Sequence, residues 1–179
     1  WNDAGTPTLV NVLFGGNACT LDGGGMRTGG AESNPLLINT TFSGNIAGGS
    51  GGGLNTTSPN LTIRNSVIWN NKDLSGTGTA GANITGVADV VAYSLIQGHA
   101  LAPPNLDGTD PGNDPLFVVP VDPDAAPTTA GDLSVKFGSP IVDVGDTAAI
   151  PPGVTVDLAG NTRIYNAIVD LGAYELPLA

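Results

Sequence analysis

A nine-residue segment recurs four times along the first hundred residues of this chain. Its copies begin at Leu9, Leu37, Ile63 and Val91, so successive copies lie 28, 26 and 28 residues apart. The Gly-Gly-Met sequence at residues 24–26 recurs 28 residues later as Gly-Gly-Leu. A fixed period of roughly 20–50 residues is typical of repeat architectures, in which a repeat buries its apolar face only by stacking on its neighbours. The period therefore restricts the fold to a stack of similar coils.

Residues at equivalent positions of the four copies form columns of constant chemical character. The first and sixth positions are apolar in every copy, and the fourth position is small or β-branched. Because side chains alternate between the two faces of a strand, we expect the fourth and sixth positions to face the interior and the fifth to face outward. The sixth-position column is Phe14, Phe42, Ile68 and Ile96, and the outward column is Leu13, Thr41, Val67 and Leu95.

Asparagine forms two further columns. Its side chain tolerates the left-handed conformation found at corners, and identical Asn residues on stacked strands can hydrogen-bond along the stack. We therefore expect both columns to mark corners and to form ladders. The third-position column is Asn11, Asn39 and Asn65 and ends in Tyr93, whereas the ninth-position column is Asn17, Asn45 and Asn71 and ends in His99.

The composition favours strands and turns over helices. The 179 residues include 27 Gly and 14 Pro, whereas strong helix formers are scarce. We predict an all-β fold, a right-handed parallel β-helix (β-solenoid) whose coils of 26–28 residues stack about 4.8 Å apart. Residues 1–99 hold the repeats. Residues 100–179 carry eleven acidic and two basic side chains, and we expect this irregular region to continue and cap the solenoid.

The segments Thr41–Asn55 and Pro59–Asn71 resemble right-handed parallel β-helix proteins of bacterial surfaces, which carry repeated FSGN and GGG motifs, as in polymorphic outer-membrane proteins. The segments Tyr93–Gly98, Asn113–Val118 and Asp157–Glu175 are similar to secreted bacterial proteins that end in a choice-of-anchor domain. Together the resemblances cover nearly the whole chain. They imply an extracellular or cell-surface protein with a structural or adhesive role, and they imply no defined reaction.

Charge and hydropathy argue against two classes of partner. With a formal net charge of −11, the chain has little with which to neutralise phosphates, so we expect no nucleic acid partner. No apolar run approaches the roughly 18 residues of a membrane-spanning helix, so we expect no membrane span. Cys19 is the only cysteine, and the chain can therefore form no internal disulfide.

The repeat starts close to Trp1, without a polar segment long enough to cap the first coil. An uncapped solenoid end exposes unpaired backbone groups and an open apolar core. We expect a second copy to cover this end in a head-to-tail contact that propagates as a filament, with segment 169–179 as a strand to be donated. The alternative is that the chain is a fragment. The expected function is that of a non-enzymatic structural or adhesive protein.

Two other functions stay open. A carbohydrate-binding module would present aromatic rings in a groove, and the candidates for a sugar or a neighbouring subunit are Trp1, Trp69, Tyr165 and Tyr174. A polysaccharide hydrolase of the pectate-lyase-like β-helix class would need two carboxylates about 5–9.5 Å apart, and a lyase would need a base beside calcium-binding carboxylates. No such set stands at matching repeat positions, so we assign no catalytic residue.

One cluster of acidic and amide side chains offers the oxygen ligands that calcium prefers. Asp and Asn beside Gly and Pro are equally the ordinary residues of turns, and Leu116 stands where an EF-hand loop needs Glu. We prefer the turn interpretation and expect no other cofactor. The candidate calcium ligands are Asn105, Asp107, Asp110 and Asp114.

Four N-x-S/T sequences mark candidate glycosylation sites. Asn39 lies in an asparagine column and is expected to be buried. Asn55, Asn60 and Asn83 lie in Gly-, Ser- and Thr-rich corners, where we expect exposed side chains. These three are therefore the candidate acceptors.

Overall fold

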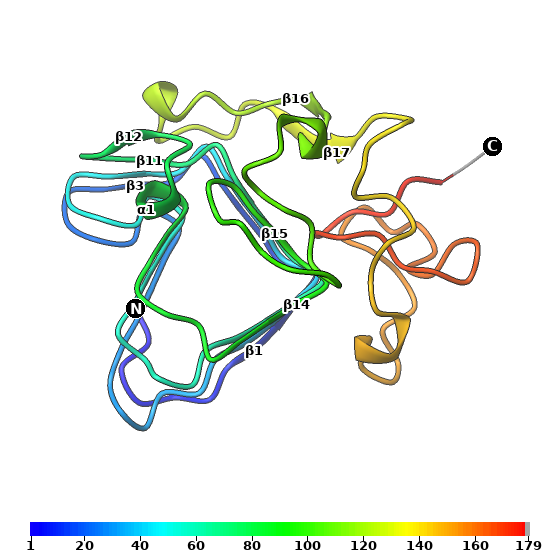
Figure 1. Cartoon of the computed structure of the whole chain (residues 1–179), viewed down its shortest axis with the longest axis horizontal. Coiled ribbons are helices and arrows are strands. Elements are labelled where there is room, and N and C mark those ends of the chain that lie inside the picture. Colours follow the sequence, from blue (N-terminus) through cyan, green and yellow to red (C-terminus); the bar gives the residue numbers. More distant parts are fainter. Residues whose placement is uncertain (178–179) are drawn as a thin grey trace.

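The computed structural model describes residues 1–177, and its first hundred residues form a β-solenoid of about three turns. Seen down the solenoid axis, successive coils lie over one another, and strands of equivalent sequence stack in parallel (Figure 1). This arrangement confirms the predicted all-β parallel β-helix.

Four stacks of short strands make up the coils. Within each stack the strands pair in parallel, except that β12 pairs antiparallel with β11. One helical turn, α1 (Ala80–Asn83), interrupts the third coil, and no helix of the described residues is long and apolar enough to cross a membrane. The stacks are β1 (Thr8–Val10), β5 (Leu36–Ile38), β9 (Thr62–Arg64) and β14 (Val90–Ala92); β2 (Leu13–Gly15), β6 (Thr41–Ser43), β10 (Val67–Trp69) and β15 (Leu95–Ile96); β3 (Ala18–Cys19), β7 (Ile46–Ala47), β11 (Lys72–Asp73) and β12 (Gly76–Thr77); and β4 (Met26–Thr28), β8 (Leu54–Thr56) and β13 (Ile84–Thr85).

The strand register reproduces the inward column of the repeat. Phe42 pairs with Phe14 on one side and with Ile68 on the other, and Ile68 pairs with Ile96. The Phe14 and Phe42 rings stack with their centroids 4.4 Å apart. The coils thus enclose one apolar core, whose buried members are Leu37, Phe42, Leu54, Leu61, Ile63, Ile68, Ile84 and Ile96.

The outward column points away from this inner core but is not a solvent-exposed face. Val67 and Leu95 are fully buried, and Thr41 is nearly so. The C-terminal region packs over these side chains and completes a second core. The buried members of the second core are Val67, Trp69, Leu95, Phe117, Val121, Leu133, Val135, Ile141 and Leu171.

The C-terminal region leaves the stack after a short closing segment, residues 99–108. There Leu106 pairs with Leu95, and Leu101 packs on the inner core. The following chain runs along the flank of the coils instead of continuing them as expected (Figure 1), because its sequence lacks the repeat's columns. Its regular elements are the antiparallel strands β16 (Phe117–Val119) and β17 (Asp132–Val135) and the 3-10 helices η1 (Pro111–Asn113), η2 (Pro123–Ala125) and η3 (Thr147–Ala149).

Glycines at two corners let the C-terminal region approach the solenoid. A Cβ atom at Gly44 would lie 2.4 Å from the Cβ of Val121, and one at Gly16 would lie 2.3 Å from the carbonyl oxygen of Thr128. Both glycines also have a positive φ, which residues other than Gly rarely adopt. The contact between the two regions therefore depends on glycine at both corners.

The third-position asparagines mark a corner, but their amides bind the C-terminal region. Asn11, Asn39 and Asn65 have left-handed backbones, with φ between 49° and 54°. Asn65 also donates to Asn39 along the stack, over 3.4 Å. Of the ladder that we expected here, this bond is present, and the amides otherwise anchor the C-terminal region, because the corner faces that region rather than solvent. The anchoring bonds run from Asn11 to the Val156 carbonyl, from Asn39 to the Asp170 carbonyl and from Asn65 to the Asp146 carbonyl, at 2.8, 2.9 and 2.9 Å.

The ninth-position asparagines form a continuous hydrogen-bonded ladder. The Nδ2 of Asn17 donates to the Oδ1 of Asn45 at 2.8 Å, and Asn45 donates in the same way to Asn71 at 2.8 Å. Asn71 then donates to Asn83 at 2.9 Å. The last rung is Asn83 in α1 instead of His99, because α1 brings an amide into the position that the repeat would give to residue 99.

Candidate functional site

The first coil presents an open strand edge. Strands β1, β2 and β3 end their stacks and pair with the second coil alone in the described chain, while Asn2 covers part of the edge of β4. In a parallel ladder, alternate residues direct their N–H and C=O groups to opposite sides. Because Val12 and Gly16 bond to the second coil, the backbone groups of Leu13 and Gly15 point toward the open side.

The inner core is also open at this end. Leu9, Phe14 and Met26 belong to the inner core but are only half-buried. A further coil stacked here would remove apolar surface from water, at about 25 cal/mol for each Å². The equivalent residues of the second coil have a coil on each side and are fully buried: Leu37, Phe42 and Leu54.

The opposite end is closed by residues 99–108. Leu106 pairs with Leu95, and the Oδ1 of Asn105 accepts a hydrogen bond from the backbone N–H of Ser94 at 3.0 Å. The segment 169–179, which we expected to be donated to a neighbour, is not free for that role in its described part, because Val169 and Leu171 are buried against the same molecule. Residues 178–179 lie outside the described residues.

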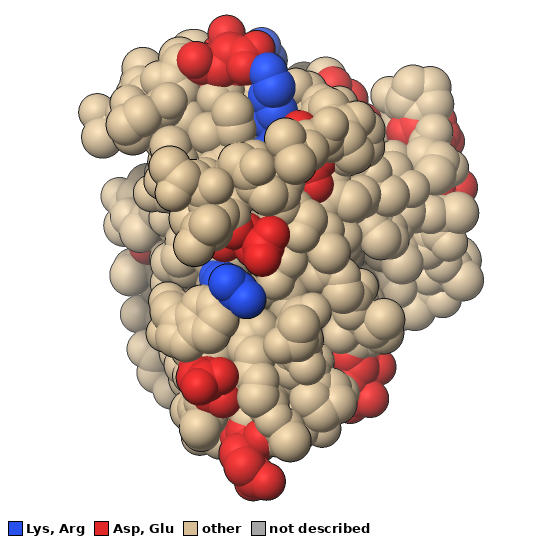
Figure 2. Space-filling model, turned by 90° about the vertical axis from the view of Figure 1, so that its left-hand side faces the viewer, with Lys and Arg blue, Asp and Glu red and all other residues tan. Residues whose placement is uncertain are grey.

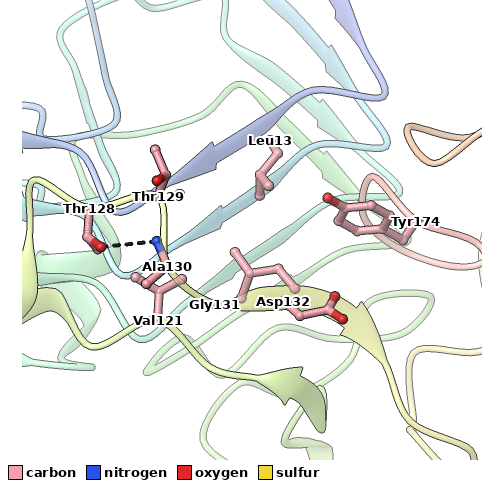
Figure 3. Close-up of a pocket in the computed structure, with 10 residues that line it drawn as sticks. Leu13, Val121, Thr128, Thr129, Ala130, Gly131, Asp132 and Tyr174 are labelled. Atoms are coloured by element: carbon pink, nitrogen blue, oxygen red, sulfur yellow. Dashed lines mark hydrogen bonds between the residues drawn. The ribbon is translucent and has the colours of Figure 1, made fainter.

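A groove of about 410 Å³ lies beside the open edge of β2 (Figure 3). Tyr174 lies across this groove from Leu13 and directs its hydroxyl toward it. The loop of residues 128–132 forms another wall, in which the Ala130 N–H donates to the Thr128 hydroxyl at 3.0 Å. Asp132 adds a carboxylate to the lining. The groove therefore combines apolar and hydrogen-bonding surfaces.

The remaining aromatic candidates lie in different settings. The Trp1 side chain is 73% exposed, and its ring centroid lies 4.1 Å from the Cζ of Arg27 on β4. Tyr165 is half-buried, and its backbone N–H donates to Glu175 at 3.2 Å. The structure thus places Trp1 at the first coil and Tyr165 beside a buried carboxylate.

Trp69 is only 9% exposed, because the C-terminal region covers it. With Asp110 and Asp114 it lines a shallow hollow of about 430 Å³. The structure therefore brings one predicted aromatic candidate next to two predicted calcium ligands. Little of the indole ring is left for stacking on a ligand.

The four candidate calcium ligands each serve in local structure. Asp107 accepts from the N–H of Thr109 at 2.8 Å, and Asp110 and Asp114 accept from backbone N–H groups two residues further on. Asn105 closes a row in which the backbone N–H of Thr40 donates to the Ser66 hydroxyl, that of Ser66 to the Ser94 hydroxyl, and that of Ser94 to the Oδ1 of Asn105. The four side chains do not converge on one point, and the turn interpretation accounts for their contacts.

A buried charged cluster lies where the C-terminal region meets the solenoid. Arg163 is fully buried, and its Nη2 lies 2.9 Å from the Oε2 of Glu175 and donates to the Asp170 carbonyl at 2.9 Å. Its Nη1 donates to the Gly172 carbonyl at 3.2 Å. The carboxylates of Asp143, Asp170 and Glu175 each have an oxygen within 4.8 Å of the other two. Among residues 1–177, this is the only such group of three potential metal ligands. Arg163 forms an ion pair with Glu175, whereas the Asp170 carboxylate accepts from the N–H groups of Asp143 and Leu176.

Burial dominates the electrostatics of this cluster. It raises the pKa of Glu175 to about 7, with a further contribution from the charge of Asp170. Burial also raises the pKa of Asp170, while it lowers the pKa of Arg163. Asp170 and Glu175 are 1% and 3% exposed, and their carboxyl groups accept hydrogen bonds from backbone N–H groups. A polysaccharide cannot reach this carboxylate pair without a rearrangement of the fold.

The candidate glycosylation sites differ from expectation in their burial. Asn55 is buried and donates to the Ser50 hydroxyl at 3.1 Å, and Asn83 is fully buried as the last rung of the asparagine ladder. Asn60 is half-buried and donates to the Ala31 carbonyl. A glycan on Asn55 or Asn83 would require these contacts to break, because both side chains are buried and hydrogen-bonded inside the protein.

The face of the molecule shown in Figure 2, the left-hand side of Figure 1, is mostly uncharged. In Figure 2 the acidic side chains on this face form small separate groups, and basic side chains are few. The described chain has two partly exposed ion pairs, Arg27 with Asp22 and Lys72 with Asp124. This face offers no continuous band of basic side chains.

Sequence reasoning missed Asn83 and Arg163. Asn83 lies 12 residues after Asn71, outside the repeat period, and only the insertion of α1 brings it into the ladder. Arg163 is one of two basic residues in the acidic region. A single basic residue between Asp157 and Asp170 is the signal that could have indicated a buried ion cluster.

No model of a protein family, no curated protein and no solved structure matches the chain. Of the resemblance to bacterial surface proteins, the structure supports the β-solenoid architecture.

Proposed function

We propose that the chain is a non-enzymatic structural or adhesive module of an extracellular or cell-surface assembly, and that copies associate head to tail through the open first coil. The observation that carries the proposal is the half-buried state of Leu9, Phe14 and Met26 beside a free strand edge. Stacking a further layer on this end pairs the edge and completes the core, which is how each internal coil is stabilised.

The difference between the two ends favours a contact between unlike surfaces. In a head-to-tail contact the first coil meets the closing segment of the next copy, where Ala102, Pro103 and Pro104 are exposed. These residues offer apolar surface to the open core. A contact between unlike surfaces that does not close into a ring propagates as a filament.

Light scattering coupled to size-exclusion chromatography tests the association. We expect the mass of the wild-type protein to rise with concentration. The variant Thr8→Lys/Ala18→Lys places two charges on exposed positions of the first coil and should be monomeric, because Lys on an edge strand opposes strand pairing. The matched control Leu74→Lys/Val87→Lys replaces two residues that are 82% and 78% exposed elsewhere on the solenoid, and it should still associate. A wild-type protein that stays monomeric, or equal loss in both variants, would refute the proposal.

The extracellular location belongs to the same proposal and is supported by the resemblance of the repeats to bacterial surface proteins. Digestion of intact source cells with an external protease is the direct measurement. Cleavage of the protein without release of cytoplasmic markers is the expected result, and full protection would contradict it.

A second candidate function, carbohydrate binding, is favoured by the groove between Leu13 and Tyr174. Its apolar wall suits the face of a sugar ring, while the Tyr174 hydroxyl and Asp132 suit sugar hydroxyls. A glycan array followed by calorimetry on the best ligand tests this function. Tyr174→Ala should abolish binding, whereas the exposed-site control Lys136→Ala should not; binding that survives Tyr174→Ala would exclude the groove.

A further inference from the structure

The asparagine ladder has a direction. In each step both the backbone N–H and the Nδ2 of an Asn donate to the Oδ1 of the following Asn of the ladder. The distances are 3.0 and 2.8 Å from Asn17 to Asn45, 3.0 and 2.8 Å from Asn45 to Asn71, and 3.3 and 2.9 Å from Asn71 to Asn83. Donors therefore always belong to the Asn nearer the N-terminus. In the first two steps the acceptor lies in the following coil, whereas in the last step Asn71 and Asn83 both lie in the third coil.

A second bond runs the opposite way across each coil contact. The Nδ2 of Asn45 also donates to the carbonyl of Phe14 at 2.8 Å, and the Nδ2 of Asn71 donates to the carbonyl of Phe42 at 3.0 Å. In each case the acceptor is the large apolar residue that lies three positions before the Asn of the earlier coil. Two neighbouring coils are thus joined through the motif large apolar–x–x–Asn, present as Phe14 to Asn17 and Phe42 to Asn45.

The ladder ends differently at its two termini. At the closed end, the Nδ2 of Asn83 donates to the carbonyls of Thr79 and Gln97, so the last amide is satisfied by backbone. At the open end, Asn17 is exposed and donates to Asn45, but none of residues 1–177 donates to its Oδ1. The unused acceptor stands beside the half-buried Phe14 and the free edge of β2.

We infer that the open first coil recognises a strand that runs parallel to β2 and carries the motif large apolar–x–x–Asn, supplied by a solenoid coil of another chain. The Asn of that strand would donate its N–H and Nδ2 to the Oδ1 of Asn17. The large apolar side chain of the strand would stack on Phe14, and the backbone carbonyl of that apolar residue would accept a hydrogen bond from the Nδ2 of Asn17. Each contact continues one that already joins the first and second coils.

The direction of the ladder selects against the reverse orientation. A strand antiparallel to β2 would reverse the order of the apolar residue and the Asn, so it could not place its Asn over Asn17 and its apolar side chain over Phe14 at the same time. Two first coils meeting face to face are disfavoured for this reason. The inference shares with the proposed function the open first coil as the site of association, and it names a different occupant, because residues 99–108 of a second copy do not carry this motif.

A peptide with the sequence of residues 37–47, LINTTFSGNIA, tests the inference as a labelled ligand in fluorescence anisotropy with the full chain. We expect saturable binding. The same peptide with Asn45→Ala should bind about three- to tenfold more weakly, since a hydrogen bond contributes roughly 0.5–1.5 kcal/mol, and the peptide of reversed sequence should not bind. Absence of binding by millimolar peptide would overturn the inference, as would equal binding of the reversed peptide.

A double-mutant cycle separates recognition by Asn17 from nonspecific binding of the peptide. In the Asn17→Ala protein, the penalty of the Asn45→Ala peptide should disappear, because its partner is already missing. The matched control Asn60→Ala, at a half-buried site outside the ladder, should preserve the penalty. An unchanged penalty in the Asn17→Ala protein would overturn the assignment.

The same experiments distinguish this inference from the head-to-tail proposal. Copies that associate in solution while the peptide neither binds nor competes would overturn the inference and leave self-association standing. Specific peptide binding to a chain that stays monomeric would support the inference and refute the head-to-tail contact. A thermal melt of each variant, monitored by circular dichroism, checks that the fold is intact.

Discussion

The solenoid and the C-terminal region that flanks it are stabilised by different means. The coils repeat, so that backbone ladders and stacked columns hold them, and residues such as Phe42 have the same kind of neighbour above and below. The flanking region has one two-stranded sheet, β16 with β17, and three short 3-10 helices, joined by irregular backbone in the described chain. Its backbone polar groups are satisfied by side chains, among them Asp157, Asp170 and Glu175.

This difference shows where polar side chains are needed to satisfy backbone hydrogen-bonding groups. In the solenoid, each strand satisfies the next, and buried amides such as Asn45 add to an existing ladder. In the flanking region, acidic side chains accept from N–H groups that have no ladder, and Arg163 balances part of the buried negative charge. Substitutions that remove one kind of support should therefore affect one region more than the other.

The largest effect is expected from Arg163→Ala. Removing this fully buried cation leaves Glu175 and Asp170 without a counter-charge, and breaking a buried pair costs about 3–5 kcal/mol. Urea unfolding combined with limited proteolysis measures the loss, and the first cleavages should fall in residues 140–177. The control Lys136→Ala removes an exposed charge and should change the free energy of unfolding by less than about 0.5 kcal/mol. First cleavages within the coils would contradict separate stabilisation of the two regions.

A smaller effect, on the solenoid, is expected from Asn45→Ala. The substitution leaves the N–H and Nδ2 of Asn17 without an acceptor and removes the Nδ2 that donates to Asn71 and to the Phe14 carbonyl, which costs about 2 kcal/mol. Asn17→Ala at the exposed end of the same ladder should cost less than about 1 kcal/mol. Urea unfolding of both variants checks the order, and equal losses would mean that the ladder does not stabilise the interior coils.

The sequence predicts the repeating region well because each coil restates the same pattern. Phe14, Phe42, Ile68 and Ile96 stack as their spacing indicates. The direction of Val67 is also predictable, since it lies between two inward positions. Its burial is not, because the residues that cover it come from a region without a period.

The candidate surfaces are less predictable for the same physical reason. The sequence indicates an open first coil and places Asn17 in a column, but the direction of the ladder follows from atomic positions. Asn105 looks like a turn residue or a calcium ligand, and it proves to cap the last coil through Ser94. Contacts of this kind depend on which loop the chain brings close, and a single sequence carries little information about that.

A rise in pH from about 5 to 8 should lower the stability of the flanking region more than that of the coils. The pKa of Glu175 is raised from 4.5 to about 7, so the folded state binds more protons than the unfolded state between these values. Its contribution to stability is therefore complete below about pH 4.5 and is lost as the pH rises through about 7, and Asp170 acts in the same direction. The expected loss between about pH 5 and pH 8 is on the order of 1–2 kcal/mol.

Urea unfolding at pH 5, 6, 7 and 8 measures this dependence. Glu175→Gln should flatten the decline, whereas Glu32→Gln at an exposed site should leave it unchanged. A stability that rises with pH over this range would show that the buried carboxyl groups are ionised at a lower pH than their surroundings imply.

The smallest effect is expected from the surface ion pair between Lys72 on β11 and Asp124 in η2, which joins the two regions. Both side chains are partly exposed, so water and salt weaken the attraction, and Asp124→Asn should cost about 0.5 kcal/mol or less. Urea unfolding with and without 0.5 M NaCl measures the cost, with Asp89→Asn as the exposed control. A loss above about 1 kcal/mol would mean that surface charge holds the flank to the coils. The small loss that we expect would instead indicate that the flanking region is held to the coils mainly by the apolar contacts over Val67 and Leu95 and by the buried Arg163 cluster.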